Sequence, residues 1–441
     1  MSTETAGPWL TGHHAPVPDE IDAHGLDVTG ALPAELTGRY FRNGPNPRPG
    51  RPSGHWFTGP GMLHGLRLRD GRAEWYRNRW VRTAERPFLR GDRTVDLAAV
   101  PSNTHVIPHA GRILSLVEVG LPYAISPELE TLGPCDFGGR LTTAMTAHPK
   151  RDPVTGELLF FGCGFTAPFL TYHRLSAAGE LVESRAIDVP GPTMTHDFAI
   201  TEHHVVWLDL PVVFDLDLAL AGRGMPYRWD DGHGARIGVM PRAGGPVRWF
   251  DVDPCYVFHT GNAYEDAAGR VVVDGARYGP ADFAGQWARI GGAAGDAATA
   301  AASTGTARLH RWTLDPATGR AAEEPLDDRG VEFPTHNDDR TGRPHRYLYT
   351  VTGSAVVKYD LAAGTSDALD LGPDRAPGEA VFVPAATGGE DAGWLLSLVS
   401  DRTGGPAELL VLDAGDLAHR ATVHLPRRVP AGFHGSWIPD A

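Results

Sequence analysis

The chain has few of the features that mark membrane-spanning, secreted or nucleic-acid-binding proteins. No apolar run approaches the roughly 18 residues of a membrane span. The first residues, MSTETAGPWLTGHHAPVPDE, lack the basic and apolar regions of a secretory signal. Lysine is scarce, and 40 basic residues stand against 54 acidic ones, for a net charge of −14. Because phosphate binding needs a basic surface, nucleic acid is excluded as a partner, while a peripheral contact with lipid stays open.

Cysteine and the common short enzyme motifs are also lacking. Only three cysteines occur, Cys135, Cys163 and Cys255, and no two are spaced as CxxC. This argues against a disulfide framework or a cysteine-bound zinc and predicts a cytoplasmic protein, because the cytosol keeps thiols reduced. The sequence has no HExxH, no GxSxG, no Walker loop and no GxGxxG between a strand and a helix.

What is present is a series of short elements separated by 54 glycines and 37 prolines. Four segments share one plan, an apolar run, a turn and a second run, which is typical of a β-hairpin. These segments are FLTYHRLSAAGELVESRAIDV, ARLHRWTLDPATGRAAEEPL, SAVVKYDLAAGTSDALDL and ELLVLDAGDLAHRATVHL. Where they recur every 40–50 residues or so, the spacing indicates the blades of a β-propeller. Unrelated hairpins in a β-sandwich are the alternative.

No composition shift divides the chain, so residues 1–441 are expected to form one domain with an N-terminal extension over about 1–28. Two stretches are expected to lie outside the blades, at about 208–235 and 281–303. The first is too long and apolar for a turn and could cover a pocket. The second mixes helix formers with breakers, which predicts a loop between blades rather than a helix. Oligomeric state is not predicted.

Histidines are the candidate metal ligands. The adjacent pairs His13–His14 and His203–His204 are poor candidates, because neighbours on a strand point to opposite faces. Better candidates stand singly, in AMTAHPK, TMTHDFAIT, CYVFHTGN and GFHGSW, and these are His148, His196, His259 and His434. The inner strands of a propeller converge on one axis, where distant histidines can meet. Four imidazoles would suit a divalent transition metal, with Fe(II) a natural choice; four separate structural histidines are the alternative.

Eight segments, in matching order from about residue 30 to the end, resemble the carotenoid cleavage oxygenases, a family that includes lignostilbene-cleaving enzymes. They are FRNGPNP, GHWFTGPGMLHG, AHPKRDPVTGEL, THDFAIT, FHTGNAYE, GVEFPTHNDDRTGRPHRYLY, GEAVFVP and FHGSWIPDA. The resemblance implies a seven-bladed propeller with long loops and short helices capping one face. It also implies non-haem Fe(2+) held by the four histidines above.

Three glutamates match those that hydrogen-bond the ligating imidazoles in the family: Glu118, Glu332 and Glu379. A carboxylate in that place fixes the imidazole tautomer and raises its basicity. The alternative for each is a solvated charge. The neighbours Thr195 and Asp197 are expected to be local scaffolding for His196.

The activity implied is cleavage of a carbon–carbon double bond of a carotenoid or apocarotenoid with O2, giving two carbonyl products. No catalytic residue is implied beyond the metal shell. The same reaction on a stilbene or phenylpropanoid is the first alternative, and a non-catalytic propeller that binds another protein is a weaker one. A propeller hydrolase would need a carboxylate cluster around calcium or zinc, and none stands out.

The sequence departs from the family in places. The stilbene-cleaving branch carries a tyrosine just before an Asn-Thr pair and a lysine some way after it. Around Asn103 and Thr104 the sequence is VPSNTHV, without tyrosine, and LGPCDFGG near Pro134 has no lysine. Tyr123 is the remaining candidate for a phenol contact. Where many relatives carry acids in the segment HWFTGPGM, this chain has Thr58, with a proline two residues on.

An apolar alkene requires a tunnel lined by aromatic side chains. The candidates are Phe57, Phe165, Phe169, Phe214, Tyr227, Trp229 and Phe258. Each has a place in the core as its alternative. Phe214 and Trp229 are the preferred tunnel residues, because both lie in the long apolar stretch 208–235.

Overall fold

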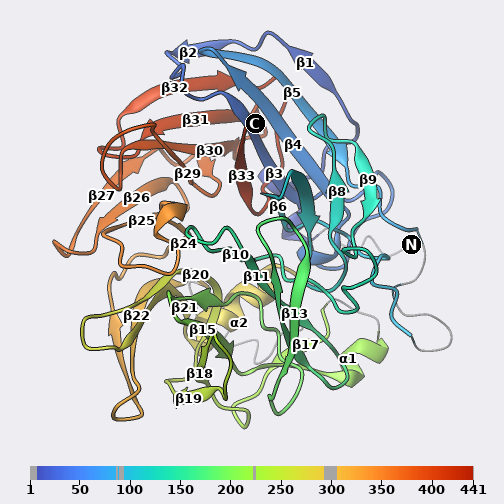
Figure 1. The fold of residues 1–441 in the computed structure, drawn as a ribbon. Coiled ribbons are helices and arrows are strands. Elements are labelled where there is room, and N and C mark those ends of the chain that lie inside the picture. Colours follow the sequence, from blue (N-terminus) through green and yellow to red (C-terminus); the bar gives the residue numbers. More distant parts are fainter. Residues whose placement is uncertain (1–6, 86–87, 89–93, 222–224, 293–304, 441) are drawn as a thin grey trace.

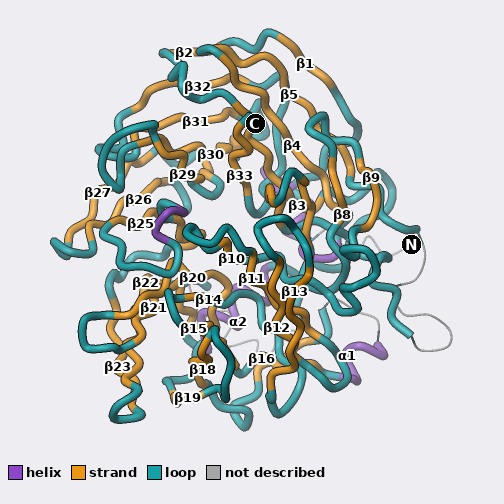
Figure 2. Tube along the Cα trace, in the orientation of Figure 1, coloured by secondary structure: helices purple, strands orange, loops and turns teal. Residues whose placement is uncertain are grey.

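The computed structural model describes residues 7–85, 88, 94–221, 225–292 and 305–440, which form a ring of β-sheets around a central axis (Figure 1). Seven of these sheets have four or more strands and form the blades. Strands far outnumber helices in the same view coloured by secondary structure (Figure 2). The prediction of an all-β, seven-bladed propeller is confirmed.

Five blades are antiparallel sheets of four strands. They consist of β6 (His105–His109), β7 (Arg112–Leu116), β8 (Tyr123–Ile125) and β9 (Thr131–Pro134); β10 (Lys150–Arg151), β11 (Leu158–Cys163), β12 (Leu170–Leu175) and β13 (Leu181–Ile187); β14 (Ala199–Ile200), β15 (His204–Asp209), β18 (Arg236–Pro241) and β19 (Arg248–Asp251); β20 (Tyr256–Glu265), β21 (Val271–Tyr278), β22 (Arg308–Asp315) and β23 (Arg320–Pro325); and β24 (Glu332–Thr335), β25 (Tyr347–Val351), β26 (Ala355–Asp360) and β27 (Thr365–Asp370).

The other two blades contain both ends of the chain. One consists, in order across the sheet, of β1 (Asp22–His24), β5 (Arg72–Trp80), β4 (Gly61–Arg69), β3 (Gly38–Pro45) and β33 (Gly435–Pro439). The other consists of β2 (Val28–Gly30), β32 (His419–His424), β31 (Glu408–Asp413) and β30 (Gly393–Asp401), with β28 (Arg375–Pro377) and β29 (Val381–Pro384) both paired to β30.

The ring is closed twice. The C-terminal strand β33 pairs with β3 in the first blade, and β2, close to the N-terminus, pairs with β32 in the last. Figure 1 shows these blue and red strands side by side. Closure leaves no open gap between the first and last blades and fixes the inner ends of the blades around the axis.

All four repeated segments form the predicted hairpins, as β12–β13, β22–β23, β26–β27 and β31–β32. In three of them the turn contains a glycine with positive φ: Gly179 (80°), Gly319 (74°) and Gly364 (65°). Glycine takes this conformation without a Cβ penalty, so these positions set the short hairpin turns.

Neighbouring blades pack through large buried side chains. Trp207 of β15 is fully buried. Its ring centroid lies 5.6 Å from that of Phe198, which directly precedes β14 in the same blade, and 6.2 Å from that of Phe161 in the preceding blade. The second strand of this blade, β15, is therefore buried along almost its whole length, whereas β27, at the outer edge of its blade, is largely exposed.

Within 208–235 the chain forms a small hairpin of β16 (Val212–Phe214) and β17 (Tyr227–Trp229), with helix α1 (Leu216–Ala221) between them. The backbone of β16 pairs with the segment before His196, because Met194 N–H donates to Val212 O at 2.7 Å. The long stretch thus supports one of the histidine segments.

The expectation of a loop from 281 was wrong in its first part, because Pro280–Arg289 form helix α2. Phe283 and Trp287 lie one turn apart on it, stack at 5.5 Å and are both buried. Their burial outweighs the low helix propensity of Gly285. The rest of that stretch, from 293 on, lies outside the described residues.

The remaining helices are single 3-10 turns, η1 (Pro8–Leu10), η2 (Gly12–His14), η3 (Trp56–Thr58) and η4 (Asp338–Arg340). In the part of the chain that the structure describes, no helix has the length and apolar character needed to cross a membrane.

Candidate metal centre

The four singly placed histidines come from four different blades. His148 and His196 lie just before the inner strands β10 and β14, His259 lies within β20, and His434 directly precedes β33. One ring nitrogen from each lies within 4.8 Å of the other three. Residues far apart in the sequence are therefore brought together at the propeller axis.

Among the described residues, the inner ring nitrogens have no hydrogen-bond partner outside the four histidines. The Nε2 atoms of His148 and His196 face each other at 3.0 Å. His259 Nε2 is buried and has no hydrogen-bond partner among the described residues. A buried imidazole nitrogen without a partner is costly. A cation that prefers nitrogen ligands would satisfy all of these atoms at once, so the donor set fits a divalent transition metal.

Three carboxylates hold the outer ring nitrogens. His196 Nδ1 donates to Glu118 at 2.9 Å. The equivalent bonds are His259 to Glu332 at 2.6 Å and His434 to Glu379 at 2.8 Å. Since Nδ1 carries the proton in each case, the Nε2 lone pairs point inward. The three predicted glutamates thus contact three of the four predicted histidines.

His148 is held differently. Its backbone N–H donates to Thr146 Oγ1 at 3.1 Å, and that hydroxyl donates to the backbone oxygen of His196 at 3.4 Å. Burial lowers the pKa of His148 well below its ordinary value, and the neighbouring imidazoles lower it further. The imidazole is therefore neutral at pH 7, as a metal ligand must be.

The glutamates are ionised despite their burial. Burial alone would raise the pKa of Glu118, but the charge and hydrogen bond of His196 oppose this, and the net pKa is lowered. The pKa values of Glu332 and Glu379 are lowered in the same way by His259 and His434. Three carboxylate charges beside the four imidazoles favour a cation at the centre.

The backbone near the centre is irregular. Phe333 has a positive φ of 52°, and its ring stacks on His259 at 5.1 Å. Its N–H donates to Glu332 Oε2 at 2.8 Å, the same oxygen that accepts from His259. The left-handed conformation of a bulky residue is unfavourable, and here it lets one segment provide both a carboxylate and a ring to His259.

A cavity of about 620 Å³ reaches the histidines. Of the seven predicted tunnel residues, four line it: Phe57, Phe165, Tyr227 and Phe258. The other three are not among the described lining residues.

Those three lie behind or away from the cavity wall. Phe214 packs behind Phe165 at 4.9 Å, and Trp229 packs on Phe283 at 5.6 Å. Phe169 is half-buried in the turn before β12.

Sequence reasoning missed other apolar lining residues, namely Trp56, Phe88, Met194, Met225, Tyr278, Phe333 and Phe433. Phe433 lies 4.6 Å from Trp56 and 5.5 Å from Phe57, between ring centroids. A signal for it existed, because Phe433 directly precedes His434 as Phe258 precedes His259.

The cavity also has a polar part, which includes His13, His14 and Arg402. The Arg402 guanidinium donates to Gly353 O at 2.6 Å. Burial, followed by the charges of His13 and Arg402, lowers the pKa of His14 to about 4. The adjacent histidines, set aside above as metal ligands, are thus neutral polar groups that line the cavity.

Residues discussed for the stilbene-cleaving branch are also placed. Tyr123 is buried, donates to Ala98 O at 2.5 Å and is not among the described lining residues. Asn103 donates to Phe57 O at 2.8 Å and holds η3 against the cavity, which Thr104 and Thr58 also line. No lysine is among the described lining residues.

Comparisons with known proteins agree with this geometry. Residues 14–439 match the family model described as retinal pigment epithelial membrane protein. A carotenoid cleavage oxygenase of Mycobacterium tuberculosis is 40% identical over 100% of this chain and 99% of that protein. Carotenoid 9,10(9',10')-cleavage dioxygenase 1 of Pisum sativum is 33% identical over 98% of this chain and 90% of its own length. The crystal structure of Pseudomonas brassicacearum lignostilbene dioxygenase matches with a TM-score of 0.88 and 30% identity, over 98% of both chains.

Proposed function

The chain belongs to the carotenoid cleavage oxygenase family, a family of dioxygenases, and on that premise we propose its substrate and metal. The enzyme is a non-haem Fe(II) dioxygenase that cleaves a carbon–carbon double bond of a carotenoid or apocarotenoid with O2. Both oxygen atoms of O2 enter the products, one in each carbonyl, so the reaction needs no other reductant. The observation that carries the proposal is the convergence of four imidazoles, three of them bonded to buried carboxylates, beside an apolar cavity.

The metal would be held by His148, His196, His259 and His434. Fe(II) bound there would supply O2 binding and activation. The orphaned Nε2 of His259 and the facing Nε2 atoms of His148 and His196 support this assignment. Glu118, Glu332 and Glu379 would keep each imidazole in the tautomer that leaves Nε2 free.

The remaining work of the site is positioning and exclusion of water. Phe57, Phe258 and Phe433 surround the space beside the histidines with apolar rings. An extended apolar alkene gains binding energy by burial there and is held in one orientation. In the described part of the cavity lining, the carboxylate side chains are those of Glu118 and Glu332, and both are hydrogen-bonded to histidines. The reaction as proposed therefore uses no separate protein acid or base.

An apocarotenoid, which is a polyene with an oxygen-bearing end, suits this cavity better than a pure hydrocarbon. One part of the wall is aromatic and the other presents Arg402, His13 and His14. A guanidinium and two neutral imidazoles can donate to a carbonyl or hydroxyl oxygen. Cleavage of a stilbene remains the second candidate, favoured by the match to the lignostilbene dioxygenase. The stilbene-cleaving branch carries a lysine, and none is among the described lining residues, which supports a carotenoid substrate over a stilbene.

A cytoplasmic location is part of the same proposal. Its support is that Cys135, Cys163 and Cys255 are all free thiols.

The test combines metal analysis with a substrate comparison. Protein purified anaerobically should contain close to one iron per chain. His196→Ala should lose that iron, whereas His173→Gln, at a buried histidine bonded to Thr143 and Ser184 within a blade, should keep it. The wild type should then cleave an apocarotenal in air faster than resveratrol. Failure to bind iron after reconstitution would refute the metal assignment, and cleavage of resveratrol alone would refute the substrate.

A further inference from the structure

Asp197 directly follows His196 and is almost completely buried, with 1% of its side chain exposed. Its Oδ1 accepts from the Lys150 ammonium at 2.8 Å and from the backbone N–H of Phe198 at 2.7 Å. Its Oδ2 accepts from both the backbone N–H and the hydroxyl of Thr260, each at 2.8 Å. Both oxygens of this carboxylate are therefore occupied by donors from three different segments.

Each of these segments carries one of the central histidines. Lys150, at the start of β10, lies two residues after His148. Thr260 directly follows His259 in β20. Because β10, β14 and β20 belong to three different blades, the Asp197 carboxylate joins three blades at their inner ends.

The strand that carries His259 needs such a support. The pairing of β20 with β21 shifts register on both sides of Thr260. Irregular strand positions of this kind change the direction of side chains and are often found beside active sites. The two bonds from Thr260 to Asp197 fix the position of this irregular segment relative to the neighbouring blade.

We propose that Asp197 is a positioning residue, which holds His148, His196 and His259 at the mutual distances that a bound metal requires. This inference rests on the proposed metal centre. Asp197 contacts none of the described imidazoles through a hydrogen bond and acts through the backbone next to them. The fourth histidine, His434, is held independently by Glu379.

Asp197→Asn tests the proposal with almost no change in volume. An amide has one accepting oxygen, so its NH2 group must face either Lys150 and Phe198 N–H or the two donors of Thr260. Co²⁺ is the probe, because its visible spectrum reports the ligand geometry. We expect Asp197→Asn to weaken the Kd for Co²⁺ at least tenfold and to change the Co²⁺ spectrum, since loss of such supporting contacts costs about 10–100-fold in metal affinity.

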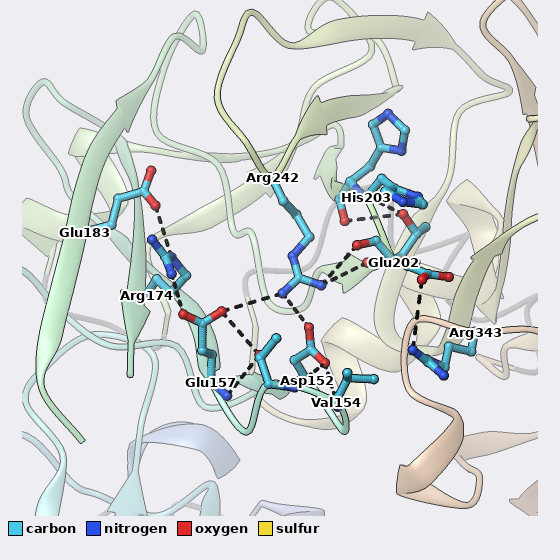
Figure 3. A network of polar contacts seen from close by, with 12 residues as sticks. Asp152, Val154, Glu157, Arg174, Glu183, Glu202, His203, Arg242 and Arg343 are labelled. Atoms are coloured by element: carbon cyan, nitrogen blue, oxygen red, sulfur yellow. Dashed lines mark hydrogen bonds and ion pairs between the residues drawn. The ribbon is translucent and has the colours of Figure 1, made fainter. Parts of the chain in front are cut away.

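Asp152→Asn is the matched control. Asp152 is 6% exposed and accepts from Val154 N–H at 2.8 Å and from Arg242 at 2.5 Å. It joins the β10 and β18 blades, as Figure 3 shows, within a network that includes Glu157 and no central histidine. The control should lower the melting temperature of the metal-free protein to a similar degree, yet keep the wild-type Kd and spectrum for Co²⁺.

The outcomes separate the possibilities. If Asp197→Asn has the same Kd and spectrum as the control, the positioning role is overturned while the metal centre stands. If the wild type itself binds no Co²⁺, the metal centre fails and Asp197 loses its proposed role with it. Should Asp197→Asn not fold, Thr260→Val and Lys150→Met each remove one side-chain contact with Asp197. Either should weaken Co²⁺ binding about threefold or more, and unchanged binding in both would equally overturn the proposal.

Discussion

Glu379 binds two consecutive groups of the C-terminal segment. One of its oxygens accepts from His434 Nδ1 at 2.8 Å, and the other accepts from the Gly435 backbone N–H at 2.8 Å. A single buried carboxylate thus fixes both the tautomer of a central histidine and the start of β33, the strand that closes the ring. Ring closure and the geometry of the metal centre are coupled at this residue.

Glu379→Gln should therefore weaken metal binding. The amide can accept from only one of the two donors, so the imidazole of His434 or the Gly435 N–H loses its partner. We expect a roughly 10–100-fold weaker Kd for Fe²⁺, measured by competition with a chelator under anaerobic conditions. Glu390→Gln is the control, since Glu390 accepts from Arg346 and Tyr347 backbone N–H groups away from the axis. Equal affinity in both variants would contradict the prediction.

Phe433→Leu should impair substrate use without loss of iron. The Phe433 ring is buried between Trp56 and Phe57 and lines the cavity. A smaller side chain removes apolar contact with the alkene, which we expect to lower kcat/KM about tenfold, mainly through KM. Phe161→Leu, in the core between two blades, should reduce stability and leave KM unchanged. A Phe433→Leu enzyme with wild-type KM would place the substrate elsewhere.

Arg402→Gln should raise the KM only for substrates that have an oxygen-bearing end. Loss of the guanidinium removes a charged donor from the polar part of the cavity, so KM for an apocarotenal should rise about fivefold. A hydrocarbon carotene has no oxygen to accept that bond, and its KM should stay the same. Arg346→Gln, which breaks a surface ion pair with Asp360, should leave both values unchanged. The same rise for both substrates would show that Arg402 does not recognise the end group.

The hairpins and the four single histidines could be predicted from local patterns, whereas the number of blades and the three glutamates followed from the resemblance to the family. Apolar runs and turn glycines such as Gly179 predict the hairpins. Each of the four central histidines and of the three glutamates bonded to them stands in its own short motif. What could not be predicted depends on contacts between blades. Helix α2 forms because Phe283 and Trp287 find a buried position, which their neighbours in sequence do not reveal. Asp197 was expected to be local scaffolding for His196, and only the fold brings Lys150 and Thr260 to it.

Metal-free protein should lose stability as the pH falls from 6.5 toward 4. Burial lowers the pKa of His173 to about 4 and that of His55 to about 3, whereas the unfolded chain keeps the ordinary value of about 6.5. Between these values the unfolded state binds protons that the folded state does not, so acid favours unfolding. The stability is therefore fully present above pH 6.5. Each such histidine should cost about 1.4 kcal/mol per pH unit within the window.

Urea unfolding of metal-free protein at pH 7, 6 and 5 measures this slope. His173→Gln should reduce it by about 1.4 kcal/mol per pH unit, because glutamine does not titrate and can still reach the hydroxyls of Thr143 and Ser184. His419→Gln, at an exposed position, is the control and should leave the slope as it is. An unchanged slope in His173→Gln would mean that His173 is already protonated in the folded protein, or that acid opens its blade before the protein unfolds.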